Sequence, residues 1–161
     1  MQRLLVSLVA GAAALLSLAI APEARAMPFG LVEDGELECL ALNIYFESRA
    51  EPVAGQLAVA HTTLNRVDDS QFPDSVCQVV RQGGEKRRGK CQFSWWCDGR
   101  SDRITEAAAW ERSLELARHA MRYRVTDPTD GALYFHNIAV SPRWANAFEL
   151  TARIGRHIFY R

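Results

Sequence analysis

Apolar side chains recur at intervals of three and four residues in three long segments of this 161-residue chain, residues 35–49, 52–67 and 105–123. Side chains at this spacing lie on one face of an α-helix. Three amphipathic helices must bury these faces against one another, so the pattern predicts a mainly helical domain. The apolar positions are Leu37, Leu40, Ala41 and Ile44, then Leu57, Ala60, Leu64 and Val67, and finally Trp110, Leu114, Ala117 and Met121.

Shorter elements complete the predicted fold. A short helix is expected over residues 72–80, and a cluster of turn formers occupies residues 127–131. Beyond that turn, residues 132–136 and 157–160 are rich in β-forming side chains. They are expected to pair as a hairpin across the irregular stretch 137–155. The predicted class is therefore α+β, a mainly α domain with a small β-hairpin element near the C-terminus.

The N-terminal segment differs in composition from the rest of the chain. Arg3 is followed by a mostly apolar stretch, residues 4–20, and then by Ala24-Arg25-Ala26. This order is typical of a secretory signal peptide with a small-x-small cleavage site. A retained membrane anchor is the alternative, although about 17 residues is at the lower limit for spanning a bilayer. We expect residues 1–26 to be removed, which leaves one domain, residues 27–161, with no stable membrane anchor.

Cysteine content agrees with export, because an even number of cysteines suits an oxidising compartment. Cys39, Cys77, Cys91 and Cys97 allow three pairings, and the sequence alone does not choose among them. The short separation of Cys91 and Cys97 favours a local loop, which would leave Cys39 to pair with Cys77. Zinc binding is the alternative, but no Cys-x-x-Cys or His-x-x-x-His pattern is present, and no metal site is predicted. The expected location is the periplasm or the cell exterior.

Charge and motif content exclude several classes of protein. The chain carries 19 basic and 19 acidic side chains, so it is not a bulk electrostatic binder of nucleic acid. Its basic segment, residues 81–90, is predicted to be an exposed loop, with contact to anionic polymers as the alternative. Phosphate-binding loops, dinucleotide-binding fingerprints, nucleophile elbows and zinc-hydrolase motifs are missing from the sequence. No cofactor is therefore expected.

Glu47 lies on the apolar face of the first predicted helix, seven residues after Leu40 and three after Ile44. A carboxyl group there must be paired, hydrated in a cleft, or kept protonated by desolvation. One interpretation is a helix-end glutamate paired with a cation such as Arg49 or Arg66. Arg49 is the weaker partner, since residues two apart on a helix do not face each other. The other interpretation is a general acid with a raised pKa at the base of a cleft.

Glu51 follows Glu47 by one helical turn, so like-charge repulsion could raise one of the two pKa values. Because Glu51 also precedes Pro52, we favour a structural role for it at the start of the next helix.

Aromatic side chains provide flat faces that stack equally well on sugars or on core neighbours. The candidates are Trp95, Trp96, Tyr134, Trp144 and Tyr160, and at least one of the adjacent pair Trp95 and Trp96 is expected to be exposed.

Seven blocks of sequence, taken together and in order, are specific enough to carry a family resemblance. They are ALNIYFESRAEP at 41–52, GQLAVA at 55–60, LNRV at 64–67, FPDSVC at 72–77, CQFSWWCDG at 91–99, DPT with GALYFHN at 127–137, and IGRHIF at 154–159. This arrangement resembles the SleB/CwlJ-type cell wall hydrolases, in the cysteine-containing form of Gram-negative relatives. Ser48 and Ala50 depart from the family's usual alanine and glycine, and neither change removes a carboxylate.

The resemblance implies a lysozyme-like helical domain that acts on peptidoglycan glycan strands. The first glutamate of the family motif is regarded as the catalytic acid and corresponds to Glu47, the residue that the helical phase also indicates. It would protonate the glycosidic oxygen between N-acetylmuramic acid and N-acetylglucosamine. Weaker candidates for lining the glycan groove, taken from the matching blocks, are Gln92, Phe93, Ser94, Tyr134 and Asn137.

Several alternatives stay open at this point. A lytic transglycosylase would use Glu47 alone and form a 1,6-anhydro product, whereas a muramidase would use water. N-acetylmuramoyl-L-alanine amidase activity is a third possibility, which the missing metal ligands disfavour. A non-catalytic peptidoglycan-binding protein is the alternative from another class. An unknown activator protein and calcium dependence are also undecided, although no EF-hand loop is present.

Overall fold

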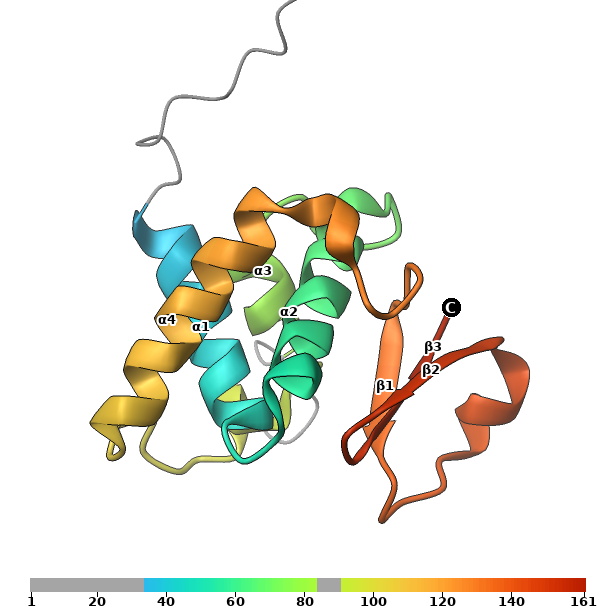
Figure 1. Cartoon of the computed structure of the whole chain (residues 1–161). Helices are drawn as coiled ribbons and strands as arrows, with labels where there is room; N and C mark the ends of the chain where they lie inside the picture. The colour runs from blue at the N-terminus through green and yellow to red at the C-terminus, as the bar shows by residue number, and fades with distance from the viewer. Residues whose placement is uncertain (1–33, 84–90) are drawn as a thin grey trace, which may run out of the picture.

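The computed structural model describes residues 34–83 and 91–161 (Figure 1). The expected signal peptide, residues 1–26, and most of the basic segment 81–90 lie outside these ranges. The elements are the helices α1 (Asp34–Ser48), α2 (Val53–Asp68), α3 (Val76–Arg81) and α4 (Ala107–Arg122), the 3₁₀ helices η1 (Ser94–Cys97), η2 (Arg124–Thr126) and η3 (Arg143–Ala147), and the strands β1 (Tyr134–Asn137), β2 (Leu150–Ile154) and β3 (His157–Tyr160). The predicted class, mainly α with a small β element near the C-terminus, is confirmed.

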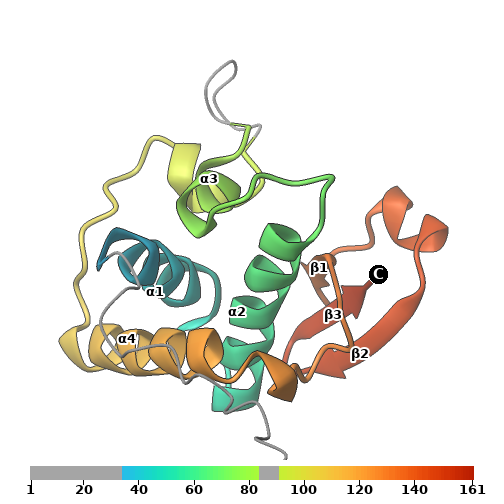
Figure 2. The ribbon, with the colours of Figure 1, turned by 90° about the horizontal axis from the view of Figure 1, so that it is seen from above.

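The helices gather on one side of the molecule and the strands on the other, with α2 between them (Figures 1 and 2). Helix α1 packs against the other three helices. Its predicted face is confirmed, because Leu40, Ala41 and Ile44 are fully buried in the main core. Helix α2 is buried along most of its length, since one face meets the helices and another meets the sheet.

Two helices differ from the prediction in detail. Helix α3 begins at Val76 rather than near Phe72, because the Ser75 hydroxyl caps it by accepting from the Gln78 backbone N–H at 3.4 Å. In α4 the most deeply buried line consists of small residues, which allow close approach to α1. These residues are Ala109, Ser113, Ala117 and Ala120, and the larger predicted core residues Trp110, Leu114 and Met121 flank them, partly buried.

The C-terminal sheet contains three antiparallel strands in the order β1-β3-β2. The predicted pairing of β1 with β3 is confirmed, with Tyr134 opposite Tyr160 and Asn137 opposite His157. The prediction of an irregular stretch over 137–155 was wrong, because it contains β2. An irregularity between Leu150 and Ala152 interrupts the alternation of this strand, so it carries no period-two signal.

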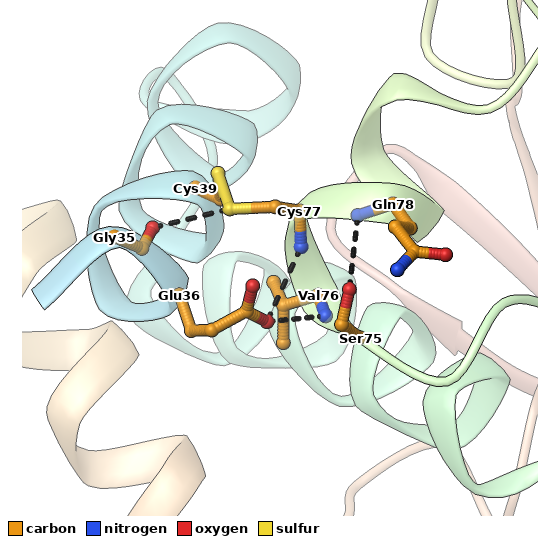
Figure 3. Close-up of a disulfide and its surroundings, with 7 residues drawn as sticks. All are labelled: Gly35, Glu36, Cys39, Ser75, Val76, Cys77 and Gln78. Carbon is orange, nitrogen blue, oxygen red and sulfur yellow. Dashed lines mark hydrogen bonds between the residues drawn. A yellow bond between two sulfur atoms is a disulfide. The ribbon is translucent and has the colours of Figure 1, made fainter. Parts of the chain in front are cut away.

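Two disulfides connect the elements, in the pairing that the spacing favoured. Cys39–Cys77 joins α1 to α3, and Cys91–Cys97 closes a short loop around η1. Figure 3 shows the first of them, where the Glu36 carboxylate also accepts hydrogen bonds from the backbone N–H groups of Val76 (2.5 Å) and Cys77 (3.3 Å). The start of α3 is therefore fixed to α1 by a covalent bond and by a carboxylate.

Removal of the Cys39–Cys77 bond by a double serine substitution is expected to lower the free energy of unfolding by about 4 kcal/mol. The reason is the loop of 38 residues that it closes, since the entropy gained by the unfolded chain grows with loop length. Removal of Cys91–Cys97, with a separation of six residues, should cost only about 2 kcal/mol. Urea unfolding of both variants measures the difference, and a larger loss for the short loop would contradict this ranking.

Among the helices of the described ranges, none combines the length and the apolar character that a bilayer crossing needs.

Candidate active site

Glu47 lies in the last turn of α1, one turn after the buried Asn43. The Asn43 side chain donates to the Thr63 hydroxyl on α2 at 3.0 Å and accepts from the Trp95 indole N–H on η1 at 3.0 Å. Phe46 stacks on Trp95 with the ring centroids 4.7 Å apart. These contacts fix the C-terminal end of α1, and with it the Glu47 backbone, against two other elements.

The Glu47 side chain is partly buried and forms no hydrogen bond or ion pair with any residue of 34–83 or 91–161. Burial disfavours the ionised form and raises its pKa from 4.5 to about 7. The positive charge of Arg66 acts in the opposite direction and limits the rise. Glu47 is therefore about half protonated at neutral pH, as a general acid requires.

Arg66, near the end of α2, is the cation that faces Glu47. It is only 1% exposed, and its guanidinium carbon lies 5.1 Å from the Phe93 ring centroid, 5.4 Å from that of Phe72 and 6.0 Å from that of Tyr134. Its Nε donates to the Leu133 carbonyl at 2.7 Å. Burial lowers its pKa to about 10, so the guanidinium stays charged at neutral pH.

Gln92 completes the surroundings of Arg66. With its amide oxygen turned toward the guanidinium, it accepts from Nη1 at 3.2 Å and from Nη2 at 3.0 Å. The interpretation of Glu47 as a simple ion-paired glutamate does not hold, since no salt bridge joins the two groups in the described part of the chain. Arg66 is instead a fixed charge beside a protonatable carboxyl.

The structure separates the five predicted groove residues into different roles. Gln92 and Ser94 are exposed at the surface, and Tyr134 and Asn137 are partly buried on β1. Phe93 is only 2% exposed, so its ring supports Arg66 and does not line an accessible groove, which corrects that prediction. Trp96 is 37% exposed and Trp95 is buried, which confirms the prediction that at least one of these adjacent residues is exposed.

Glu51 forms a structural contact with the sheet, rather than at the start of α2 where its position before Pro52 had led us to expect it. Its side chain is only 6% exposed, and its carboxylate accepts from the Arg156 backbone N–H at 2.8 Å in the turn between β2 and β3. Gly155, with φ +59°, precedes Arg156 in this turn. Glu51 therefore connects the α1–α2 linker to the sheet and is not available as a second catalytic carboxylate.

Substitution of Gly155 by alanine is expected to destabilise the fold by about 1–3 kcal/mol. A β-carbon there would lie 2.2 Å from the Glu51 carboxylate oxygen, and the positive φ disfavours any side chain. Gly35→Ala is the matched control, because nothing lies within 4 Å of its β-carbon and alanine is the better helix former. Chemical denaturation should give Gly35→Ala a free energy of unfolding equal to or above that of wild type. A Gly155→Ala variant as stable as wild type would contradict the predicted clash and backbone strain.

The described residues contain no group of three or more histidine, cysteine or acidic side chains arranged to hold a metal ion.

Comparison with known proteins identifies the family of the chain. The profile of the cell wall hydrolase family matches residues 50–160, beginning three residues after Glu47. The spore cortex-lytic enzyme of Bacillus subtilis (strain 168) is 33% identical over 137 residues, or 83% of this chain, so position 47 lies within the aligned stretch. The spore cortex-lytic enzyme of Halalkalibacterium halodurans is 30% identical over 127 residues. The chain spans 39% and 34% of these two relatives.

Two solved structures are also similar to this chain. The catalytic domain of the Bacillus cereus SleB protein matches with a TM-score of 0.59 and 31% identity, over 80% of this chain and 91% of that one. The catalytic domain of the germination-specific lytic transglycosylase SleB from Bacillus anthracis matches with a TM-score of 0.61 and 30% identity, over 84% of this chain and all of that one. The chain belongs to the cell wall hydrolase family.

Proposed function

We propose that this chain cleaves peptidoglycan glycan strands between N-acetylmuramic acid and N-acetylglucosamine, with Glu47 as the proton donor. The observation that carries the proposal is a single carboxyl group at the end of α1, which burial keeps substantially protonated at neutral pH beside the fixed charge of Arg66. Membership of the cell wall hydrolase family and the similarity to SleB catalytic domains support the substrate class.

In the first step Glu47 transfers its proton to the glycosidic oxygen while the bond from that oxygen to C1 of the muramic acid breaks. Positive charge develops at C1 and the sugar bearing the oxygen leaves as an alcohol. Glu47 is now a carboxylate, and the buried guanidinium of Arg66 stabilises it. A charge that is already fixed in place needs no reorganisation during this step.

The second step that we favour is intramolecular. The C6 hydroxyl of the same muramic acid attacks C1, and the Glu47 carboxylate takes its proton, which gives a 1,6-anhydro sugar and restores the acid. This route needs one carboxyl group, and Glu51, the nearest other one in sequence, is bound to Arg156. The similarity to a lytic transglycosylase supports the same choice. Attack by water, which would give reducing ends, is the alternative.

Mass spectrometry of the products released from purified sacculi tests the proposal. Muropeptides with 1,6-anhydro ends are the expected products. Reducing muramic acid ends would replace the transglycosylase step by hydrolysis. Free stem peptides without glycan cleavage would mean an amidase, and binding to sacculi without release would mean a non-catalytic protein. Either of the last two results would overturn the proposal.

The pH dependence follows from the raised pKa. Because the donor is the protonated form, kcat/KM is expected to fall as pH rises through about 7, approaching a tenfold loss per pH unit above it. Initial rates of muropeptide release between pH 5 and 9, on one batch of sacculi, measure this decline, which is the alkaline limb of the rate profile. A rate that is constant from pH 6 to 8.5 would exclude a donor with this pKa.

We also propose that residues 1–26 direct export and are removed, so that the domain acts in the periplasm or outside the cell. The basic, apolar and small-residue order of this segment and the two disulfides support this location. The N-terminus of protein recovered from the cell envelope is expected to be Met27. A chain that retains residues 4–20 there would instead be anchored.

A further inference from the structure

An open pocket of about 530 Å³ lies on the C-terminal sheet, between β3 and the segment that connects β1 to β2. Figures 1 and 2 show this segment on the side of the sheet that faces away from the four helices. We call this hollow the sheet pocket. Neither Glu47 nor Arg66 lines it. The lining residues that matter to the argument are His136, Val140, Phe148, Leu150, Arg153 and Tyr160.

One wall of the sheet pocket is apolar and open to solvent. Ile138 is 58% exposed, Val140 56%, Leu150 44% and Phe148 37%. Four exposed apolar side chains around one hollow are typical of a surface that binds something. The floor is more rigid, because His136 Nε2 and the Tyr160 hydroxyl are 3.0 Å apart and the two rings are stacked.

The pocket is also lined by a cation that has no partner among the described residues. Arg153 on β2 is exposed, and its side chain makes no hydrogen bond or ion pair with the residues that the structure describes. The neighbouring acid Glu149 is already paired with Arg161 at 3.2 Å. The sheet pocket therefore combines an apolar wall with an available positive charge, and it is complementary to a short, partly apolar anion.

Aromatic contacts connect the sheet pocket to the surroundings of Glu47. The Tyr134 ring lies beside the Arg66 guanidinium on one side and 4.3 Å from the Phe148 ring on the other, measured between centroids. Phe148 lines the pocket. The row Arg66, Tyr134 and Phe148 therefore joins the cation beside Glu47 to the wall of the pocket.

We propose that the sheet pocket binds the stem peptide that branches from muramic acid, with Arg153 pairing with a peptide carboxylate and the apolar wall contacting the alanine methyl groups. This inference rests on the proposed function and names a second part of the same substrate. A stem of five residues extends about 17 Å, so it reaches well beyond the sugar that carries it. A strand without stems carries only the lactyl carboxylate of muramic acid, which is fixed to the sugar ring and brings no alanine methyl group to the apolar wall.

The test compares cleavage of two substrates, glycan strands that carry stem peptides and the same strands stripped of stems by an amidase. Wild type is expected to have at least about a tenfold higher kcat/KM on the stem-bearing strands. Arg153→Glu should lose most of this preference and leave the rate on stripped strands unchanged. Arg143→Glu is the matched control, because Arg143 is exposed on η3 and does not line the pocket, and it should behave as wild type.

Two other outcomes would overturn the proposal. An equal loss on both substrates would mean that the pocket binds the glycan itself, and no loss on either would mean that it does not contact the substrate. If wild type cleaves neither substrate, the proposed function fails. Binding of a free stem tetrapeptide then tests the pocket independently of cleavage. Amide NMR shifts at Phe148 and Arg153 that saturate in wild type and not in Arg153→Glu would support the pocket, and their absence in wild type would overturn it.

Discussion

Replacement of Glu47 by glutamine is expected to lower the rate of glycan cleavage by about 10²–10⁴-fold. The amide has nearly the same shape as the protonated acid but cannot donate a proton to the glycosidic oxygen. Since Glu47 forms no hydrogen bond or ion pair with the described residues, nothing else in the site is left unpaired. Glu38→Gln is the matched control, because Glu38 is exposed on the same helix and should retain wild-type activity.

The same substitution should change stability in a pH-dependent way. The pKa of Glu47 in the folded chain, about 7, is higher than the ordinary 4.5 of the unfolded chain. Wild type therefore loses stability as pH rises from about 4.5 to about 7, whereas glutamine does not titrate. Glu47→Gln should match wild type at pH 4 and exceed it by up to about 3 kcal/mol at pH 8. Equal stability of the two proteins at pH 8 would contradict the burial of Glu47.

Substitution of Arg66 by methionine has the second largest expected effect. The variant should lose about 3 kcal/mol of stability, because removal of the buried guanidinium leaves the Leu133 carbonyl and the Gln92 amide oxygen without their charged donor. It should also move the alkaline limb of the rate profile to higher pH. Arg66 lowers the pKa of Glu47, so its removal lets that pKa rise above 7.

The shift of the alkaline limb separates the electrostatic role of Arg66 from a merely structural one. Arg66→Lys keeps the positive charge and should return the limb toward its wild-type position, even where stability is not fully restored. Rate profiles of the two variants between pH 5 and 9, normalised to the folded fraction, provide the comparison. If both variants lose activity and neither shifts the limb, Arg66 supports the fold without acting on Glu47.

Periodicity predicted the helices and the location of Glu47, because burial imposes a regular spacing on an amphipathic helix. Leu40 and Ile44 define the buried face of α1, and Glu47 continues it. Resemblance between β1 and β3 in composition was enough to predict their pairing. Strand β2 was not predicted, because its irregular pairing near Leu150 and its partly exposed residues leave no alternation to detect.

The role of Arg66 could not be derived from a local pattern. Helix α2 is buried on more than one side, so an arginine in it lies off the apolar stripe and looks like a solvent-exposed residue. Its surroundings come from Phe72, Phe93 and Tyr134, which are up to 68 residues away in sequence and meet only in the folded chain. The sequence suggested Arg66 only as one possible partner of Glu47.

The most direct test of the central claim is an NMR titration of the Glu47 side-chain carboxyl carbon in uniformly ¹³C-labelled protein. Assignment comes from the signal that disappears in Glu47→Gln. We predict a titration midpoint near pH 7, because burial outweighs the charge of Arg66. A midpoint near 4.5 would show that Glu47 is ionised and solvated at neutral pH, and would contradict its assignment as the catalytic acid.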